Sequence, residues 1–449
     1  MIEAMKRAFT IPELRNRLQF VLMMFIVYAI GAHIPVPGID HKKLEAMFNG
    51  RGGVLDLLNV FSGGSLRRMS IFGMTIGPYI NASIIMQMMS FAVPQLEALS
   101  KEGETGRKQI AKITRYLTIV LGLFQSFGMT LMFAQNNIQI TFFQQVLICV
   151  TLTAGTMFLL WMGEQITQKG VGNGVSLIIF AGILLSLPFQ FGTMFAMIIA
   201  HTNNVSWFNF IILLAAFIGM IYGVVYLTQG VRRIPTQHTK RVIGMRQTQA
   251  SGSFLPIKVN MAGVIPIIFA ISLIMLPQTL IAAIPFKNGF ITWLKDIAQY
   301  TNPSNMPVIP NTNIHLPIAM VFYFLLVIVF TYLYTAITMN VPEIAENLNK
   351  YGSYIPGIRQ GKPTKDYLEK VVSRITLAGA FFLGLIAISQ YIMPTITGFT
   401  QSAFPLIGGT SLLIVVGVAI ETMQAVEAQL LMRNYEGFIK DGPAPKPQT

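Results

Sequence analysis

Residues 317–338, PIAMVFYFLLVIVFTYLYTAIT, carry no charged side chain along their whole length. A helix of about 20 apolar residues crosses the roughly 30 Å hydrocarbon core of a bilayer, so this stretch predicts a membrane span. Nine comparable stretches occur elsewhere in the chain. Because backbone amides in lipid need partners within their own segment, we expect every span to be a helix. The ten expected spans are 18–36, 70–93, 116–134, 144–163, 175–191, 207–228, 261–284, 317–338, 375–397 and 405–427.

The composition of the whole chain supports this interpretation. Its 449 residues are 53% hydrophobic and only 11% charged. A globular domain carries about 25% charged residues, so this chain lacks the polar surface that a soluble fold needs. The first apolar stretch has no clear small-residue cleavage site and more spans follow it. We therefore expect a retained helix there, not a removed signal peptide.

Lys and Arg predict the orientation. If residue 1 is cytoplasmic, the N-terminus, the connections on that side and the C-terminal tail hold 25 of the 32 basic residues. The outer connections 135–143, 192–206 and 398–404 hold none. The positive-inside rule then places both termini in the cytoplasm. In a membrane protein, the net charge of +14 reports topology before it reports any affinity for nucleic acid.

The ten spans divide into two sets of five. The expected parts are an N-terminal half over 1–191, an outer connection over 192–206, a C-terminal half over 207–428 and a cytoplasmic tail over 429–449. An odd number of spans in each half reverses the second copy, so the arrangement is compatible with an inverted repeat. We therefore predict an all-α polytopic membrane protein.

Three connections are longer than a helix hairpin requires. The first outer loop, 37–69, contains an amphipathic segment that is too short and too charged to span a membrane. The connection 229–258 holds six basic residues and no acidic one. The connection 339–374 holds six basic and four acidic residues, with several Gly and Pro as turn punctuation. The positive-inside rule explains the charge of these cytoplasmic connections but not their length.

No catalytic or metal-binding pattern emerges from the sequence. Cys149 is alone, and the five His match no ligand spacing. The segment from Gly357 to Lys362 imitates a phosphate-binding loop, but it is one residue short and Pro363 replaces the Ser or Thr. We therefore expect no enzyme, no cofactor and no metal, and a partner or a gradient as the energy source.

Ionisable residues are almost missing from the spans. Glu164, Glu421 and Glu427 lie near the cytoplasmic ends of their helices, where interfacial solubilisation is the simplest interpretation. Neutral amides occur nearer mid-span, at Asn81, Gln87, Gln125 and Gln390. They either bond helix to helix, worth under about 1 kcal/mol each, or line a path. A secondary transporter would need ionisable residues at mid-span, and a membrane-embedded enzyme would need a catalytic cluster.

A series of motifs runs through nearly the whole chain in one order. They are NVFSGGSL (59–66), SIF (70–72), PYINASII (78–85), KEGETGR (101–107), GTMF (155–158), WMGEQIT (161–167), KVNMAGVIP (258–266), YIPGIR (354–359) and GGTSLLI (408–414). This series resembles the SecY family, the pore subunits of the bacterial protein translocase. The resemblance implies an hourglass channel built from two inverted-repeat halves, with a plug helix near residues 59–72.

The resemblance also implies which side chains form the pathway. A constriction of five isoleucines is expected at Ile76, Ile80, Ile179, Ile268 and Ile414. The plug is expected to include Ser62, Gly63, Gly64, Ser65, Leu66, Arg67 and Arg68. Each isoleucine alone would be ordinary in a membrane helix, because such a side chain usually packs or faces lipid. A narrow apolar ring nevertheless has a physical purpose, since it dewets and blocks ions while a peptide can still pass.

The gate and the partners follow from the same resemblance. The channel is expected to open sideways toward lipid, with Asn81, Gln87, Gln125 and Asn260 holding the lateral gate closed. The two long cytoplasmic connections are expected to dock the ribosome or the SecA ATPase through Lys240, Arg241, Arg246 and Arg359. SecE and SecG are expected subunits, signal sequences the recognised ligands, and the cytoplasmic membrane the location. A specialised accessory member of the family is the alternative within this class.

Overall fold

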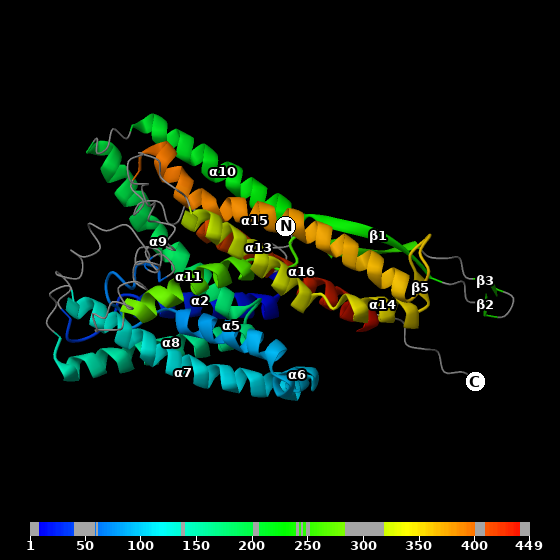
Figure 1. Cartoon of the computed structure of the whole chain (residues 1–449), viewed down its shortest axis with the longest axis horizontal. Coiled ribbons are helices and arrows are strands. Elements are labelled where there is room, and N and C mark those ends of the chain that lie inside the picture. The colour runs from blue at the N-terminus through cyan, green and yellow to red at the C-terminus, as the bar shows by residue number, and fades with distance from the viewer. Residues whose placement is uncertain are drawn as a thin grey trace. The chain divides into compact units, whose positions relative to one another are not determined.

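The computed structural model describes residues 9–39, 59, 62–135, 140–200, 206–238, 242–243, 246–247, 252–282, 318–399 and 409–440. Its helices are α2 Pro12–Gly31, α5 Gly77–Ala92, α6 Pro94–Lys101, α7 Glu104–Gln135, α8 Phe142–Lys169, α9 Gly174–Ile199, α10 Trp207–Gln229, α11 Ile265–Ala282, α13 Ile318–Thr338, α14 Val341–Lys350, α15 Lys362–Thr397 and α16 Gly409–Lys440 (Figure 1). Its strands are β1 Val231–His238, β2 Val242–Ile243, β3 Arg246–Gln247, β4 Gly252–Lys258 and β5 Ser353–Tyr354.

Each of the ten predicted spans overlaps one of these helices. Within the described ranges, seven helices are long and apolar enough to cross a membrane, namely α2, α8, α9, α10, α13, α15 and α16. Of the other three, α5 has only 16 residues. The helix α7 begins at Glu104 and so adds a charged stretch before its apolar part. In α11 the side chains are described only as far as Ile274. The helical, multi-span prediction is confirmed.

Two details differ from the prediction. The span expected from residue 70 begins only at Gly77, because Pro78 favours a helix start and residues 62–76 form consecutive turns. The predicted plug helix is accordingly a run of turns in its described part, since Gly63 and Gly64 adopt positive φ angles of 64° and 81°. In addition, the connections 229–258 and 339–374 contain strands, so the all-α description holds for the spans alone.

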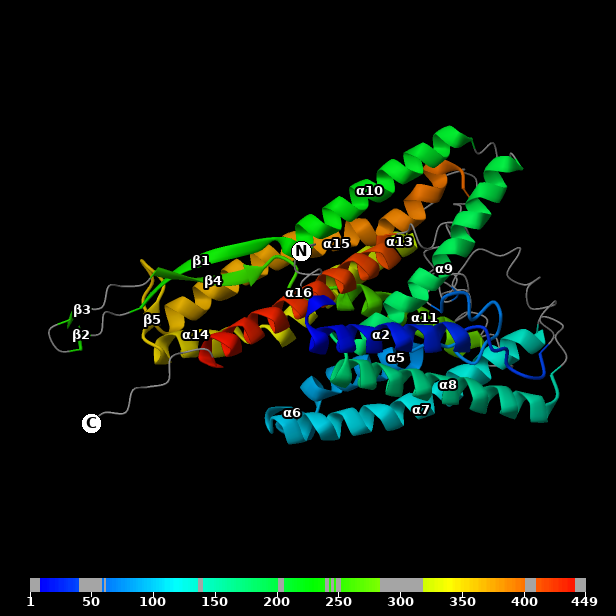
Figure 2. The same cartoon turned by 180° about the vertical axis from the view of Figure 1, so that it is seen from behind.

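Contacts divide the chain into two compact units. Unit 1 contains residues 1–192, 282–285 and 414–449, and unit 2 contains residues 193–281 and 286–413. In unit 1, α5 packs on α7, and α8 packs on both α7 and α2 (Figure 2). A small cluster of Leu14, Val171 and Val426 joins the start of α2 to the later part of α16. The early helix α2 and the late helix α16 therefore pack in the same unit.

In unit 2, α15 packs against α10, α13 and α14. Strand β1 pairs antiparallel with β4 from Val231↔Lys258 to Gln237↔Gly252, and on its other edge with β5. The sheet order is therefore β4-β1-β5, which joins the connection 229–258 to the connection 339–374. Both connections thus contribute to one folded region.

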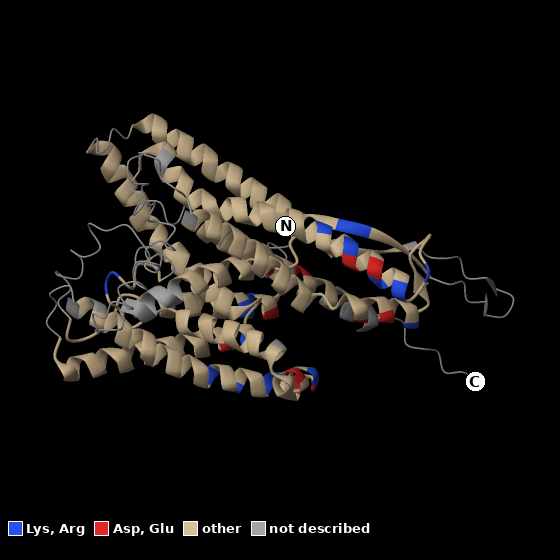
Figure 3. Ribbon diagram, in the orientation of Figure 1, with Lys and Arg blue, Asp and Glu red and all other residues tan. Residues whose placement is uncertain are grey.

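Charged side chains gather at one end of each unit taken by itself (Figure 3). In unit 1 many of them lie on α6 and on the first turns of α7, with others on α2 and in the turns at Arg67 and Arg68. In unit 2 they lie on β1, α14 and the first turns of α15. The helices α10 and α13 contain no charged residue. This distribution is what a bilayer requires, because charge in hydrocarbon is costly and collects at the water interface.

Candidate functional site

The predicted plug segment is folded tightly by its own side chains. Ser62 Oγ donates a hydrogen bond to the carbonyl of Asn59 at 2.8 Å and accepts one from the Leu66 amide at 3.0 Å. Asn59 Oδ1 accepts from the Arg67 amide at 2.8 Å. These side chains take the place of helical backbone bonds, as short polar residues do in turns. The motif NVFSGGSL therefore dictates the turn.

The plug residues differ in exposure. Ser62, Gly63, Ser65 and Leu66 are buried, Gly64 and Arg67 are partly buried, and Arg68 is exposed. Leu66 joins a cluster with Met69, Ile148 and Leu152, all of them fully buried. Ser65 Oγ is also buried and has no hydrogen-bond partner among the described residues. The segment is thus packed into unit 1 through its apolar side.

The end of this segment is anchored by Phe72. The Phe72 ring stacks between Tyr28 and Phe158, with ring centroids 5.8 and 5.9 Å apart. A methyl group at Gly31 would collide with that ring, and one at Gly155 would collide with the Ile71 carbonyl oxygen. The glycines of α2 and α8 therefore make the slot that holds Phe72.

Backbone bonds fix the same end to the chain that follows α2. The Ile71 amide donates to the Ile34 carbonyl at 3.0 Å, and the Val36 amide donates to the Met69 carbonyl at 2.8 Å. Met69 and Thr75 are the two non-glycine residues with positive φ within the described ranges, at 45° and 50°. Such conformations are disfavoured for residues with a side chain, and they bracket the anchored stretch.

The predicted ring residues come from both units. Ile76, Ile80, Ile179 and Ile414 belong to unit 1, and Ile268 belongs to unit 2. Ile76 and Ile414 are buried, with exposed fractions of 0% and 1%. Ile80, Ile179 and Ile268 are partly exposed. The ring itself stays a prediction, because each unit is described on its own.

The predicted gate residues also lie in both units. Asn81 and Gln87 lie on α5, Gln125 lies on α7, and all three are partly exposed. Asn260 lies between β4 and α11 in unit 2 and is 7% exposed. Its Oδ1 atom has no hydrogen-bond partner among the described residues, and neither has Gln87 Oε1. A buried acceptor without a partner is unusual, so these two amides are the members of the predicted gate with an unsatisfied hydrogen-bond acceptor.

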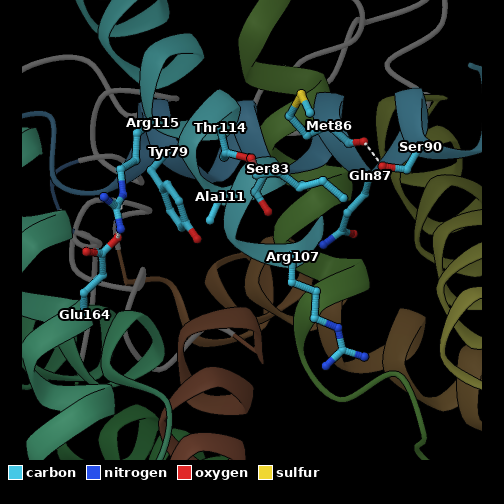
Figure 4. A pocket seen from close by; sticks show the side chains of 11 residues that line it. Tyr79, Ser83, Met86, Gln87, Ser90, Arg107, Ala111, Thr114, Arg115 and Glu164 are labelled. Carbon is cyan, nitrogen blue, oxygen red and sulfur yellow. Dashed lines mark hydrogen bonds and ion pairs between the residues drawn. The ribbon is translucent and has the colours of Figure 1, made fainter. Parts of the chain in front are cut away.

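Gln87 lines a polar pocket between α5, α7 and α8 (Figure 4). The Arg115 and Glu164 side chains point toward each other there, and Arg115 binds Glu164 Oε1 through two nitrogens at 2.7 and 2.9 Å. Other polar lining residues are Tyr79, Ser83, Ser90, Arg107 and Thr114. The sequence interpretation missed this pocket and treated Glu164 as an interfacial group. Arg115 and Glu164 are 49 residues apart, so no local sequence pattern indicated that they pair.

The predicted docking region is a packed structure in unit 2. Its apolar core contains Ile234 and Ile257 from the hairpin, Val341 and Ala345 from α14, and Leu368 from α15. The Tyr354 hydroxyl donates to Gln237 Oε1 at 3.0 Å, which joins β5 to β1. The sequence showed two separate basic connections, whereas the structure joins them.

Arg359 is exposed in a turn flanked by Gly357 and Gly361, whose φ angles are 81° and 91°. Its carbonyl accepts a hydrogen bond from Thr364 Oγ1 at 2.8 Å, so the turn is held to the start of α15. Lys240 and Arg241 lie outside the described residues. Arg246 begins β3, and its side chain is not described. Among the predicted docking side chains, the structure thus places that of Arg359.

Exposed ion pairs lie on the surface of this region. In α14, a hydrogen bond from Lys350 at 2.8 Å lowers the pKa of Glu346 and raises that of Lys350. Both groups are fully exposed, so water and salt screen the pair and it adds little stability. Within the described residues, no group of three or more His, Cys, Asp or Glu is placed to hold a metal ion.

These features define a class of protein. The spans are nearly uncharged, a glycine-rich turn is packed among them, and an extramembrane region is built from two long connections. That combination describes a polytopic membrane protein with an internal plug and a folded region between its spans. The SecY family model matches residues 70–423. The chain belongs to the SecY family.

Relatives and solved structures agree with this assignment. The chain is 42% identical to the protein translocase subunit SecY of Staphylococcus aureus, over 98% of this chain and 99% of the relative. It is 39% identical to SecY of Streptomyces scabiei, over 98% and 100%. Its fold matches a structure described as a protein-conducting channel, with TM-score 0.67 and 17% identity over 96% of this chain and 95% of the other. It also matches Sec61 in a canine ribosome–channel complex, with TM-score 0.62 and 16% identity over 96% and 95%.

Proposed function

We propose that this chain is the central channel subunit of a Sec translocase. It passes unfolded secretory polypeptides across the cytoplasmic membrane and releases membrane-protein helices sideways into it. The observation that carries this proposal is the 42% identity to a translocase subunit over 98% of the chain. The nearly uncharged spans and the packed glycine-rich turn are the features such a channel needs.

The pathway runs between two halves, residues 1–191 and 207–428, joined by 192–206. Five isoleucines, Ile76, Ile80, Ile179, Ile268 and Ile414, form the constriction, and residues 62–68 plug it. An apolar constriction excludes ions by dewetting, and it has no charged group that would hold a passing peptide. The burial of Ile76 and Ile414 and the packing of Leu66 support this assignment.

Segments of the translocating polypeptide are sorted at the lateral gate by their affinity for lipid. An apolar core of about ten residues, at about −0.3 to −0.6 kcal/mol each, gains roughly 3–6 kcal/mol on entering the bilayer. A single Asp, Lys or Arg at the centre costs about 2.5–3.5 kcal/mol and cancels much of that gain. Asn81, Gln87, Gln125 and Asn260 hold the gate closed through polar contacts until such a segment arrives. Gln87 Oε1 and Asn260 Oδ1 are buried acceptors without a partner among the described residues, so they are the atoms for which this proposal requires a contact.

The docking region binds the partners that drive polypeptide into the channel. Lys240, Arg241, Arg246 and Arg359 contact SecA or the ribosome, whose RNA phosphates attract basic side chains. SecE and SecG complete the complex, and both termini of this chain lie in the cytoplasm. The exposure of Arg359 supports this proposal, as do the structural neighbours, which include Sec61 and yeast Ssh1 bound to ribosomes.

Reconstitution tests the proposed function. The chain is purified with co-expressed SecE and SecG, placed in vesicles, and supplied with SecA, ATP and a secretory precursor. We expect ATP-dependent protection of the precursor from added protease. Vesicles that hold SecE and SecG without this chain serve as the control. Protection no greater than in those vesicles would contradict the proposal.

A further inference from the structure

One face of α9 receives the plug. Gly182, Leu185 and Phe189 are spaced by three and four residues and so lie on one side of the helix. A Cβ added at Gly63 would lie 2.8 Å from the Gly182 carbonyl oxygen and 3.3 Å from Leu185 Cβ. The backbone of the plug therefore lies close against the backbone of α9, which requires glycine at position 63.

Arg67 contacts the same face one turn further along. Its guanidinium carbon lies 4.9 Å from the centre of the Phe189 ring, within the range of a cation–π interaction. The amide of Arg67 is fixed by Asn59 Oδ1, so the turn itself aims the side chain. The next residue, Arg68, is exposed to solvent instead. The two neighbouring cations thus have different environments.

The two ends of the plug are held in different ways. Phe72 is enclosed in the slot between α2 and α8, and two backbone bonds fix residues 69 and 71. Gly63 and Arg67 instead meet α9 through one close approach and one ring contact. Met69 lies between these ends with a positive φ of 45°, a conformation of the kind that stores strain at switch regions. The Ser62 carbonyl also accepts a hydrogen bond from the Tyr28 hydroxyl at 3.4 Å, so movement of the plug has to break that bond as well as the Arg67 ring contact.

We propose that Arg67 is a positioning residue that latches the plug to α9 through the face of Phe189. The latch favours the closed channel and is released when the plug moves. This role of Arg67 rests on the proposed function, in which residues 62–68 are the plug. The ring contact selects one position of the plug on α9.

The experiment measures anion leak from vesicles that contain the complete channel complex without SecA or precursor. A cation–π contact worth about 0.5–2 kcal/mol corresponds to a change of about 2- to 30-fold in the closed-to-open ratio. Arg67→Ala is expected to raise the leak by that factor, and Arg67→Lys by less. Phe189→Leu is also expected to raise the leak. The double variant is expected to leak by less than the product of the two single factors, because both substitutions remove the same contact.

The control is Arg233→Ala, which removes a second cation–π pair, 5.0 Å from Phe254, far along the chain from the plug. It is expected to leave the leak unchanged. Deleting residues 62–68 tests the plug itself. A deletion that does not increase the leak would overturn the plug assignment. A leaky deletion combined with an unchanged Arg67→Ala leak would overturn the latch alone. A leak factor in the double variant equal to the product of the two single factors would also overturn the latch, since independent defects add in free energy.

Discussion

Glu164 and Arg115 show what a single pair of residues contributes inside unit 1. They join α8 to α7 beside Gln87 and Tyr79, in the wall of the polar pocket. Their side chains are 30% and 49% exposed, so water still screens them in part. The pair therefore brings two charges to the helix junction as one nearly neutral unit. The sequence indicated a helix-end carboxylate here, but not its partner.

Exchanging the two charges tests this contact. Arg115→Ala and Glu164→Ala are each expected to lower the free energy of unfolding by about 1 kcal/mol, since the pair is half exposed. The exchanged variant Arg115→Glu/Glu164→Arg is expected to recover most of that loss. Thermal unfolding of the detergent-solubilised complex measures the change. No recovery in the exchanged variant would show that geometry other than the ion pair is responsible.

Arg359 carries the prediction for docking. Its side chain is exposed in a glycine-flanked turn, so its replacement removes no packing. Arg359→Glu is expected to slow SecA-driven export of a secreted reporter by tenfold or more, on the order of the 1.4 kcal/mol that one repelling contact costs. Membrane insertion of the channel itself should be unchanged. Lys362→Glu, an equal change of charge at the start of α15, is the control. Export at the normal rate in the Arg359 variant would remove this residue from the docking surface.

At the scale of elements, apolar length and composition were enough to predict the spanning helices. Every predicted span overlaps a helix, because apolar length is a local property of the chain. The β4-β1-β5 sheet was not predictable in the same way. Its pairing of Gln237 with Tyr354 joins residues 117 positions apart, and neither connection alone shows the partner. The resemblance to the SecY family named the plug but not its turns, which depend on Asn59, Ser62 and the two positive φ glycines.

Gly155 tests how tightly two elements pack. A methyl group there would overlap the Ile71 carbonyl oxygen, which belongs to the backbone and cannot swing aside. Gly155→Ala is therefore expected to destabilise the protein by about 1–3 kcal/mol and to raise anion leak by loosening the Phe72 anchor. Gly219→Ala on α10 is the matched control, because nothing lies within 4 Å of the added carbon. Equal thermal stability of the two variants would contradict the proposed slot.

At the scale of the whole molecule, the channel fold extends over nearly the whole chain. The family model covers residues 70–423, so the channel fold does not depend on any single assignment. The polar pocket, the plug latch on α9 and the joined docking region came from the structure alone. They depend on contacts between segments that are distant in sequence, and a sequence pattern reports only its own neighbourhood.

The central claim is that polypeptide passes through the apolar ring. A photo-reactive amino acid is placed in turn at Ile80, Ile179 and Ile268, and at Ile218 on the lipid-exposed side of α10, which is 59% exposed. A precursor arrested midway through translocation is then illuminated. We expect adducts with the precursor from the three ring positions and none from position 218. Adducts at position 218 alone, or equal yields at all four positions, would contradict the account.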